Sequence, residues 1–160
     1  PLGGDDGEAK AFAARRAVHQ GATEIAVMLP VGALKGGDLR GALADVAAVH
    51  RELASAARLE VVLESRLLTD EEKVAAAAIA VDGGADLVAA ATGCVAGEAS
   101  PADVRLLRRA VGEDVGVKAA GAIADGGAAQ DLLAAGADRL GVEDAVRIVT
   151  AGGDPREGMP

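Results

Sequence analysis

Short apolar runs alternate with longer amphipathic segments along the whole chain. The apolar runs show no polar alternation, which is typical of parallel strands buried on both faces. Strands are therefore expected at 24–29, 59–64, 86–91, 115–119 and 138–142. The other segments have apolar residues at helical spacing, and helices are expected at about 8–20, 38–57, 70–82, 101–111, 126–135 and 143–151. Strands that alternate with helices predict an α/β protein with a parallel sheet.

A repeated Gly-Ala dipeptide supports this division into units. It opens GATEIAVMLP at Gly21, GADLVAAATG at Gly84 and GADRLGVEDA at Gly136, each after an alanine-rich helical segment. Glycine is common just past a helix C-terminus because it adopts a positive φ without steric cost. Helix starts are marked as well. TDEE at 69–72 has the form of a capping box, and SPAD at 100–103 places serine before a proline at the first helical position.

The composition narrows the class of protein. With 160 residues, 51% of them hydrophobic, the chain is expected to form one domain, and no apolar run approaches the roughly 20 residues of a membrane span. A net charge of −9 and a single aromatic residue, Phe12, argue against a nucleic-acid partner, which needs clustered cations and stacking rings. The single cysteine and the absence of a leader pattern favour the cytoplasm.

Common phosphate-binding and nucleophile motifs are absent from the sequence. No G-x-G-x-x-G turn, no G-x-x-x-x-G-K-[ST] loop and no G-x-S-x-G elbow occurs. A complete (β/α)8 barrel takes about 200–250 residues, so five strands predict either an open sheet or part of a barrel. In both cases, sequential β-α-β units should place the strand at 59–64 between those at 24–29 and 86–91.

Several stretches, in one order and with consistent spacing, resemble the deoxyribose-phosphate aldolase family. They include VGALKGGD, LLTDEEK, GADLVAAATG, DVRLLRRAVGEDVGVKA and GADRLGVEDAVRIV. The resemblance implies a (β/α)8 TIM barrel and a class I mechanism, in which a lysine amine forms a Schiff base with an aldehyde and no cofactor takes part. The chain would hold strands four to eight and their helices. We expect a partial barrel over 1–152 and a loose tail at 153–160.

The same resemblance implies that the central chemistry has been replaced. The family's Schiff-base lysine would stand at Ala89 and its acid/base aspartate at Ala26, so neither the amine nor the carboxylate is present. The family's second lysine is retained as Lys118, which makes it the one catalytic candidate. Lys118 is expected at the C-terminal end of its strand, where barrel chemistry resides.

The substrate contacts implied by the resemblance are only partly present. Positions that match the family's pattern, and are expected to bind substrate, are Glu64, Thr92, Gly93 and Gly121. The phosphate turns have instead become GAIA at 121–124 and VED at 142–144. This change brings Glu143 and Asp144 to where a phosphate dianion would sit.

Two functions follow from these residues. The first is a non-catalytic member of the family that acts, if at all, through binding or assembly. The second is an active lyase that uses Lys118 as the Schiff-base lysine on 2-deoxyribose 5-phosphate or on an unphosphorylated aldehyde. No metal-ligand spacing occurs, although Glu64, Glu143 and Asp144 carry oxygen ligands. A thiol nucleophile at Cys94 would lack a histidine on its face.

A partial barrel would also have open sheet edges. Its first and last strands would expose unpaired backbone groups, which favours association. The expected partners are therefore a second copy or another chain at these edges, and a small aldehyde or sugar phosphate at the site. Neither nucleic acid nor a membrane is expected.

Overall fold

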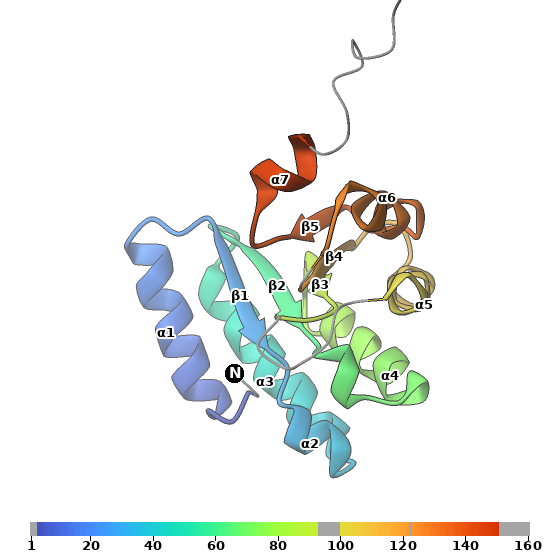
Figure 1. Cartoon of the computed structure of the whole chain (residues 1–160). Coiled ribbons are helices and arrows are strands. Elements are labelled where there is room, and N and C mark those ends of the chain that lie inside the picture. The colour runs from blue at the N-terminus through green and yellow to red at the C-terminus, as the bar shows by residue number, and fades with distance from the viewer. Residues whose placement is uncertain (1–2, 93–99, 122, 151–160) are drawn as a thin grey trace, which may run out of the picture.

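The computed structural model describes residues 3–92, 100–121 and 123–150 (Figure 1). Its strands are β1 (Glu24–Met28), β2 (Arg58–Val62), β3 (Leu87–Ala89), β4 (Gly116–Ala120) and β5 (Arg139–Gly141). Its helices are α1 (Gly7–His19), α2 (Val31–Lys35), α3 (Leu39–Leu53), the 3-10 turn η1 (Ser65–Leu67), α4 (Asp70–Asp82), α5 (Pro101–Val111), α6 (Gly126–Ala134) and α7 (Ala145–Thr150). Every strand is followed by at least one helix, so the predicted α/β class is confirmed.

The five strands form one parallel sheet in the order β1-β2-β3-β4-β5. In this register Val61 of β2 lies opposite Val27 on one side and Val88 on the other. The strand predicted at 59–64 therefore lies between its two neighbours in sequence, and the predicted strand order is confirmed.

Helices α1 to α6 contribute to one hydrophobic core on one face of the sheet (Figure 1). The strand residues that enter this core are apolar and completely buried: Leu59, Val61, Leu63, Val88, Val117 and Ala119. The helices meet them with residues that include Val46, Val49, Leu53, Val104 and Leu107. Successive side chains of a strand point to opposite faces of the sheet. Since these residues point toward the helices, the residues next to them in each strand point toward the other face.

The opposite face of the sheet is concave. Glu24 and Arg139 lie on the two edge strands, yet Arg139 Nη1 donates to Glu24 Oε1 at 2.6 Å and to Oε2 at 2.8 Å. In a flat sheet, four strand spacings of about 4.8 Å would separate these strands by roughly 19 Å, which is more than the two side chains can span. The sheet therefore curls as part of a barrel does, and the ion pair crosses the hollow.

Most predicted elements agree with the structure to within two residues, and those at 70–82 and 101–111 agree at both ends. The helix expected at 38–57 is wrong at its C-terminal end, because α3 stops at Leu53. Ala54 and Ser55 take left-handed backbone with φ of 47° and 62°, which ends the helix without a glycine. The short elements α2 and η1 were not predicted, since neither is long enough to show a periodic pattern.

The local signals found in the sequence act as predicted. Gly21, Gly84 and Gly136 have φ of 100°, 93° and 107°, and each lies just past the end of a helix. The capping box at the start of α4 is complete. Glu72 N–H donates to the Thr69 hydroxyl at 3.2 Å, and Thr69 N–H donates to Glu72 Oε2 at 2.8 Å.

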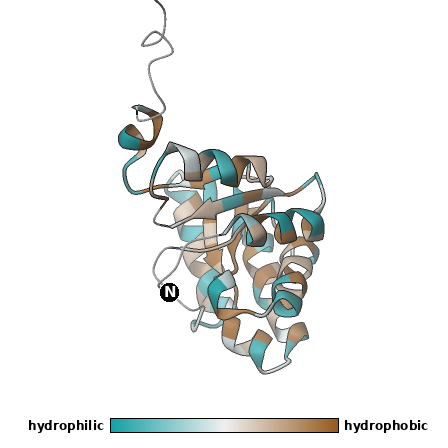
Figure 2. Cartoon of the chain, turned by 45° about the vertical axis from the view of Figure 1, so that its right-hand side comes forward, coloured by the Kyte–Doolittle hydropathy of each residue, from teal (hydrophilic) through white to brown (hydrophobic). Residues whose placement is uncertain are grey.

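The edge strands and the last helix are the least covered parts of the described chain. The central strand β3 is buried on both faces, and so is β2 after Arg58. At the edges, β5 has no buried residue and Val27 is the one buried residue of β1. The expectation that every strand is buried on both faces is therefore wrong for the two edge strands. α7 also has no buried residue and stands apart from the body (Figure 2). No helix in the described ranges has the length and apolar character needed to cross a membrane. The tail expected at 153–160 lies outside the described residues.

The Glu24–Arg139 pair should stabilise the curled sheet by a modest, pH-dependent amount. The hydrogen bond from Arg139 is the main cause that lowers the pKa of Glu24 below its ordinary value of 4.5. A carboxyl with a depressed folded-state pKa contributes stability above its unfolded pKa, and loses it as the pH falls through the folded value. Because these side chains are 32% and 38% exposed, we expect a coupling free energy of at most about 1 kcal/mol near neutral pH.

Urea unfolding of a double-mutant cycle, with Glu24→Gln and Arg139→Gln, measures this coupling. The matched control is the Arg15–Glu52 pair, which is 3.8 Å apart and more exposed, and should couple less. The coupling of Glu24 with Arg139 should vanish at acid pH, where Glu24 is protonated. A value that persists unchanged there would contradict the ion-pair interpretation.

Candidate functional site

A pocket of about 550 Å³ occupies the concave face near the C-terminal ends of the strands. The strands and the segments that follow them supply its lining: Ala26, Glu60, Val62, Ala91, Thr92, Lys118, Ala120, Gly121, Gly141, Val142 and Glu143. Strand alternation explains this set, because Glu60 and Val62 point into the hollow while Leu59 and Val61 point toward the helices. Ligands of parallel α/β folds bind at this end of the sheet, which makes the pocket the candidate site.

The charged centre of the pocket is an ion pair between β4 and β2. Lys118 Nζ donates to Glu60 Oε1 at 2.8 Å and to Oε2 at 3.0 Å. The side chain of Glu60 is 2% exposed and that of Lys118 is 27% exposed. A carboxylate buried to this degree is costly unless it is paired, so the contact holds both side chains in place. Lys118 is the middle residue of β4, and the expectation that it ends its strand is wrong by two residues.

The Lys118–Glu60 ion pair reaches across β3, over the position of Ala89. Ala89 is the register partner of Lys118, and Leu87, two residues earlier, is the register partner of Glu60. Ala89 is completely buried and is not among the residues that line the pocket. On the other side of Lys118, a Cβ added to Gly141 would lie 3.4 Å from Lys118 Cε. Small residues on both neighbouring strands therefore accommodate the lysine side chain between them.

Glu64 is fully buried and holds Thr92, which lies a short distance after the end of β3. Its Oε1 accepts hydrogen bonds from the Thr92 backbone N–H at 2.8 Å and from the Thr92 hydroxyl. The backbone of Glu64 is left-handed, with φ of 51°, which is strained for a residue with a Cβ. Within the described chain, Glu64 Oε2 and Ser65 Oγ are buried and have no hydrogen-bond partner. Glu64 thus positions Thr92, and its contact with a substrate stays a prediction.

The other predicted binding positions fall in different places. Thr92 and Gly121 line the pocket. Gly121 has a φ of 133°, in the range that favours glycine. Gly93 lies outside the described residues, and so does Cys94. Two of the four predicted positions are therefore at the pocket surface, and a third lies behind it.

The rim of the pocket is acidic on the side of β5. Glu143 lines the pocket and is exposed, whereas Asp144 is used locally, where its Oδ1 accepts the Arg147 N–H at 2.9 Å in the first turn of α7. The charged lining consists of one lysine and two glutamates, so it is negative by one charge. Among the described residues no three metal-ligating side chains form a cluster, and Glu64, Glu143 and Asp144 are not brought together.

All four lysines of the chain form ion pairs. The pairs are Lys10–Asp45, Lys35–Glu72, Lys73–Asp103 and Lys118–Glu60, with Nζ–O distances of 2.9, 2.9, 2.6 and 2.8 Å. Burial disfavours the charged form of Lys73, but its hydrogen bonds to Asp103 and Asp70 outweigh this effect and raise its pKa. Of the four, Lys118 alone lies in the pocket on the concave face, as predicted.

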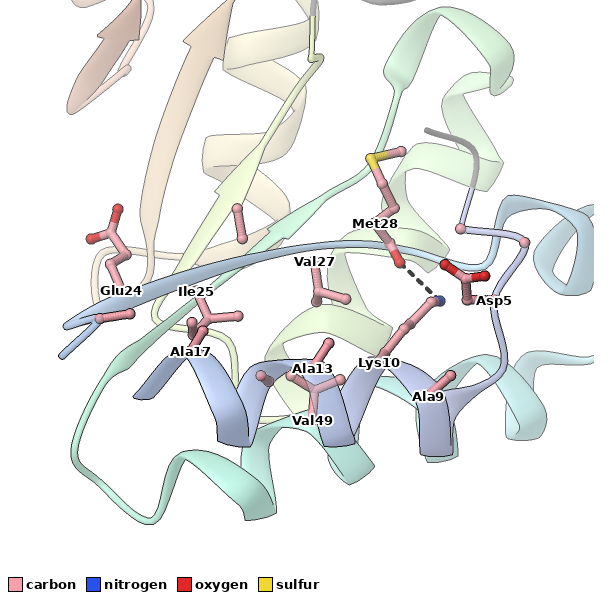
Figure 3. A pocket seen from close by; sticks show the side chains of 15 residues that line it. Asp5, Ala9, Lys10, Ala13, Ala17, Glu24, Ile25, Val27, Met28 and Val49 are labelled. Carbon is pink, nitrogen blue, oxygen red and sulfur yellow. Dashed lines mark hydrogen bonds between the residues drawn. The ribbon is translucent and has the colours of Figure 1, made fainter. Parts of the chain in front are cut away.

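A second pocket, of about 700 Å³, runs along the free edge of β1 beside α1 (Figure 3). Every residue of β1 lines it, and the facing side of α1 contributes Ala9, Ala13, Ala14 and Ala17. Lys10 reaches into this pocket, but its Nζ donates to the Met28 carbonyl at 3.2 Å and to Asp45. The lining consists mainly of strand backbone and methyl groups, so we interpret this pocket as the uncovered edge of the sheet.

Glu60 is the site residue that the sequence analysis missed. The signal was an acid inside the apolar run at 59–63, at a position that alternates with the core residues Leu59 and Val61. A charged side chain inside a buried strand has to find a partner. Lys118, in GVKAAG, is the matching exception in another strand.

Comparisons with known proteins agree with this fold. No protein-family model matches the chain. The chain is 47% identical over 150 residues to the deoxyribose-phosphate aldolase of Brevibacillus brevis. The aligned region covers 94% of this chain and 67% of that protein. The structure of QR15, an aldolase, is 30% identical, with a TM-score of 0.87, over 92% of this chain and 66% of its own. The deoxyribose phosphate aldolase from Aeropyrum pernix, described as a tetramer, is 28% identical, with a TM-score of 0.83, over 93% of this chain and 63% of its own.

The chain thus spans about two thirds of the length of these proteins. The resemblance identified from the motifs extends over nearly the whole described sheet and its helices. The structural matches confirm an α/β fold of the TIM-barrel aldolase type, of which this chain covers a part. The chain belongs to the deoxyribose-phosphate aldolase family.

Proposed function

We propose that this chain does not cleave 2-deoxyribose 5-phosphate, and that it acts through binding or assembly. The observation that carries the proposal lies on β3 and β4, beside the pocket. The methyl group of Ala89 stands where the family resemblance places the Schiff-base lysine, and the amine of Lys118 is paired with Glu60. Class I cleavage begins when a neutral amine attacks the substrate carbonyl carbon. Ala89 has no amine, and both carboxylate oxygens of Glu60 engage the amine of Lys118.

The lining of this pocket also offers few groups that could transfer a proton. Cleavage of a carbon–carbon bond through an imine needs a group that removes the proton from the substrate hydroxyl. Ala26, at the position of the family's aspartate, contributes only a methyl group to the lining. Glu60 is the register partner of Ala26 and carries a carboxylate, but both of its oxygens accept hydrogen bonds from Lys118.

Charge at the rim disfavours a phosphorylated substrate. A phosphate dianion near Gly121 would approach Glu143, and the described lining offers no arginine and no lysine besides Lys118. Since like charges repel and Lys118 is already neutralised by Glu60, the pocket is better suited to a small uncharged aldehyde than to a sugar phosphate.

Association is the second part of the proposal. β1 and β5 each have one free edge, and unpaired strand edges are surfaces on which other chains assemble. The tetrameric Aeropyrum pernix relative supports an oligomer, either of this chain with itself or with a partner that covers these edges. The cytoplasm stays the expected compartment.

A second function is favoured by one specific contact. Lys118 could act as a relocated Schiff-base lysine on an unphosphorylated aldehyde, with Glu60 as the group that takes up and returns protons. The 2.8 Å contact between Lys118 Nζ and Glu60 Oε1 has the geometry of such a catalytic pair. This alternative differs from the main proposal in requiring a covalent adduct on Lys118.

Borohydride trapping distinguishes the two functions. In the presence of borohydride and either 2-deoxyribose 5-phosphate or acetaldehyde, we expect no adduct on Lys118, because Glu60 occupies its amine and Glu143 repels a phosphate group. Intact-mass measurement followed by peptide mapping reads out the result, with Lys118→Ala as the control. An adduct that the parent chain forms and Lys118→Ala lacks would establish the lyase instead.

Restoring the lysine alone should not restore the reaction. We expect Ala89→Lys to cleave 2-deoxyribose 5-phosphate at close to the background rate, since the new side chain would compete for space with the Lys118–Glu60 ion pair. Ala26 would still supply no carboxylate. An assay of acetaldehyde release measures the rate, with Ala89→Met as a control of similar length and no amine. Substantial cleavage by Ala89→Lys alone would show that the other losses matter little.

The 160-residue chain should associate in solution. We expect light scattering after size exclusion to give a mass above that of a monomer, which is 15.7 kDa, because both edge strands and α7 lack cover. Ala26→Pro, which removes a backbone N–H from the edge strand β1, serves as the variant, with a melting curve to check its fold. A monodisperse monomer with a cooperative melt at high concentration would contradict the assembly proposal.

A further inference from the structure

The ion pair between Glu60 and Lys118 restricts the position of the lysine amine. Both carboxylate oxygens of Glu60 accept from one Nζ, at 2.8 and 3.0 Å. The contact spans β3, because Glu60 lies on β2 and Lys118 on β4. Lys118 is therefore drawn sideways over Ala89, toward the wall of the pocket.

Other charges around Lys118 do not make this contact. The charged groups nearest to it on the concave face, besides Glu60, are Glu24 on β1, Arg139 on β5 and Glu143 after β5. Glu24 is engaged by Arg139, and Glu143 is exposed at the rim. Glu60 is the one carboxylate among them that is hydrogen-bonded to Lys118 and removed from water. The state of the lysine therefore depends mainly on Glu60.

We propose that Glu60 is a positioning residue that holds the Lys118 amine in a buried ion pair, turned across Ala89, and thereby masks an amine able to condense with a small uncharged aldehyde. The inference rests on the proposed function, since it explains why Lys118 is silent in an intact pocket. An ammonium group has no lone pair and cannot attack a carbonyl. The masked amine is otherwise well placed, because 27% of its side chain is exposed in a pocket with small, uncharged walls on most sides.

The reaction that Glu60 suppresses can be written in full. The lone pair of neutral Lys118 Nζ attacks the aldehyde carbon, and the carbonyl oxygen takes up a proton to give a carbinolamine. The carbinolamine loses water to give an imine, which is protonated to an iminium ion. Hydride from added cyanoborohydride then reduces the iminium to a stable secondary amine. With acetaldehyde as the probe, the product is Lys118 carrying one ethyl group.

Replacing Glu60 by glutamine should unmask the lysine. An amine held by both oxygens of a buried carboxylate has to leave that contact before it can meet an aldehyde. We therefore expect Glu60→Gln to be ethylated at Lys118 at least about tenfold faster than the parent chain near neutral pH. Peptide mapping assigns the ethyl group to its lysine.

The matched control uses another lysine–carboxylate pair of the same length. Lys35 Nζ lies 2.9 Å from Glu72 Oε2, outside the pocket and exposed. Glu72→Gln should leave ethylation of Lys118 unchanged. Glu60→Asp keeps the charge, withdraws it by one methylene group, and should give an intermediate rate at Lys118. Circular dichroism confirms that each variant is folded, and Glu60→Asp carries the test if Glu60→Gln does not fold.

Three results separate the possibilities. An unreactive parent chain with a fast Glu60→Gln variant supports both the masking role and the proposed function. An unreactive parent chain with folded Glu60 variants that are equally unreactive overturns the masking role and leaves the proposed function standing. A parent chain that is readily ethylated at Lys118 near neutral pH, and not accelerated by Glu60→Gln, overturns the masking role, whereas release of acetaldehyde from 2-deoxyribose 5-phosphate by the parent chain overturns the proposed function.

Discussion

Charge pairing across a curled sheet is the constraint on which the rest of this molecule depends. A carboxylate removed from water, as that of Glu60 is, costs several kcal/mol unless it is paired. One pair, Glu24–Arg139, joins the two edges of the sheet, and the other, Glu60–Lys118, spans its centre. The Glu24–Arg139 pair needs the sheet to curl, because four strand spacings separate its residues. The shape of the pocket and the absence of a free amine inside it thus have one physical cause.

The order and type of the main elements could be predicted because their signals are local. Gly21, Gly84 and Gly136 mark helix ends through their backbone freedom, and sequential β-α-β units leave one strand order. The early end of α3 at Leu53 could not be predicted in the same way. It depends on a left-handed turn at Ala54, a residue type that normally extends a helix.

The candidate site was predictable only in part, for a related reason. Lys118 was found because it resembles a family motif, and Thr92 and Gly121 reach the pocket as expected. Glu60 was missed because its meaning depends on a contact between residues 58 positions apart, set by the register of three strands. Identity of 47% to an aldolase establishes the family. Activity, however, depends on a few side chains, and a single replacement such as Ala89 hardly changes the overall identity.

The contact between Glu24 and Arg139 also bears on how the chain folds. It joins residues 115 positions apart, whereas every strand pairing in the sheet joins neighbours in the sequence. Ordering a long intervening segment costs more entropy than closing a short one, so contacts of this range form late. Helices and adjacent strands can assemble as the chain is synthesised, but the hollow gains its second wall only after β5 has emerged. Binding in the pocket is thus a property of the finished fold and of no intermediate that precedes it.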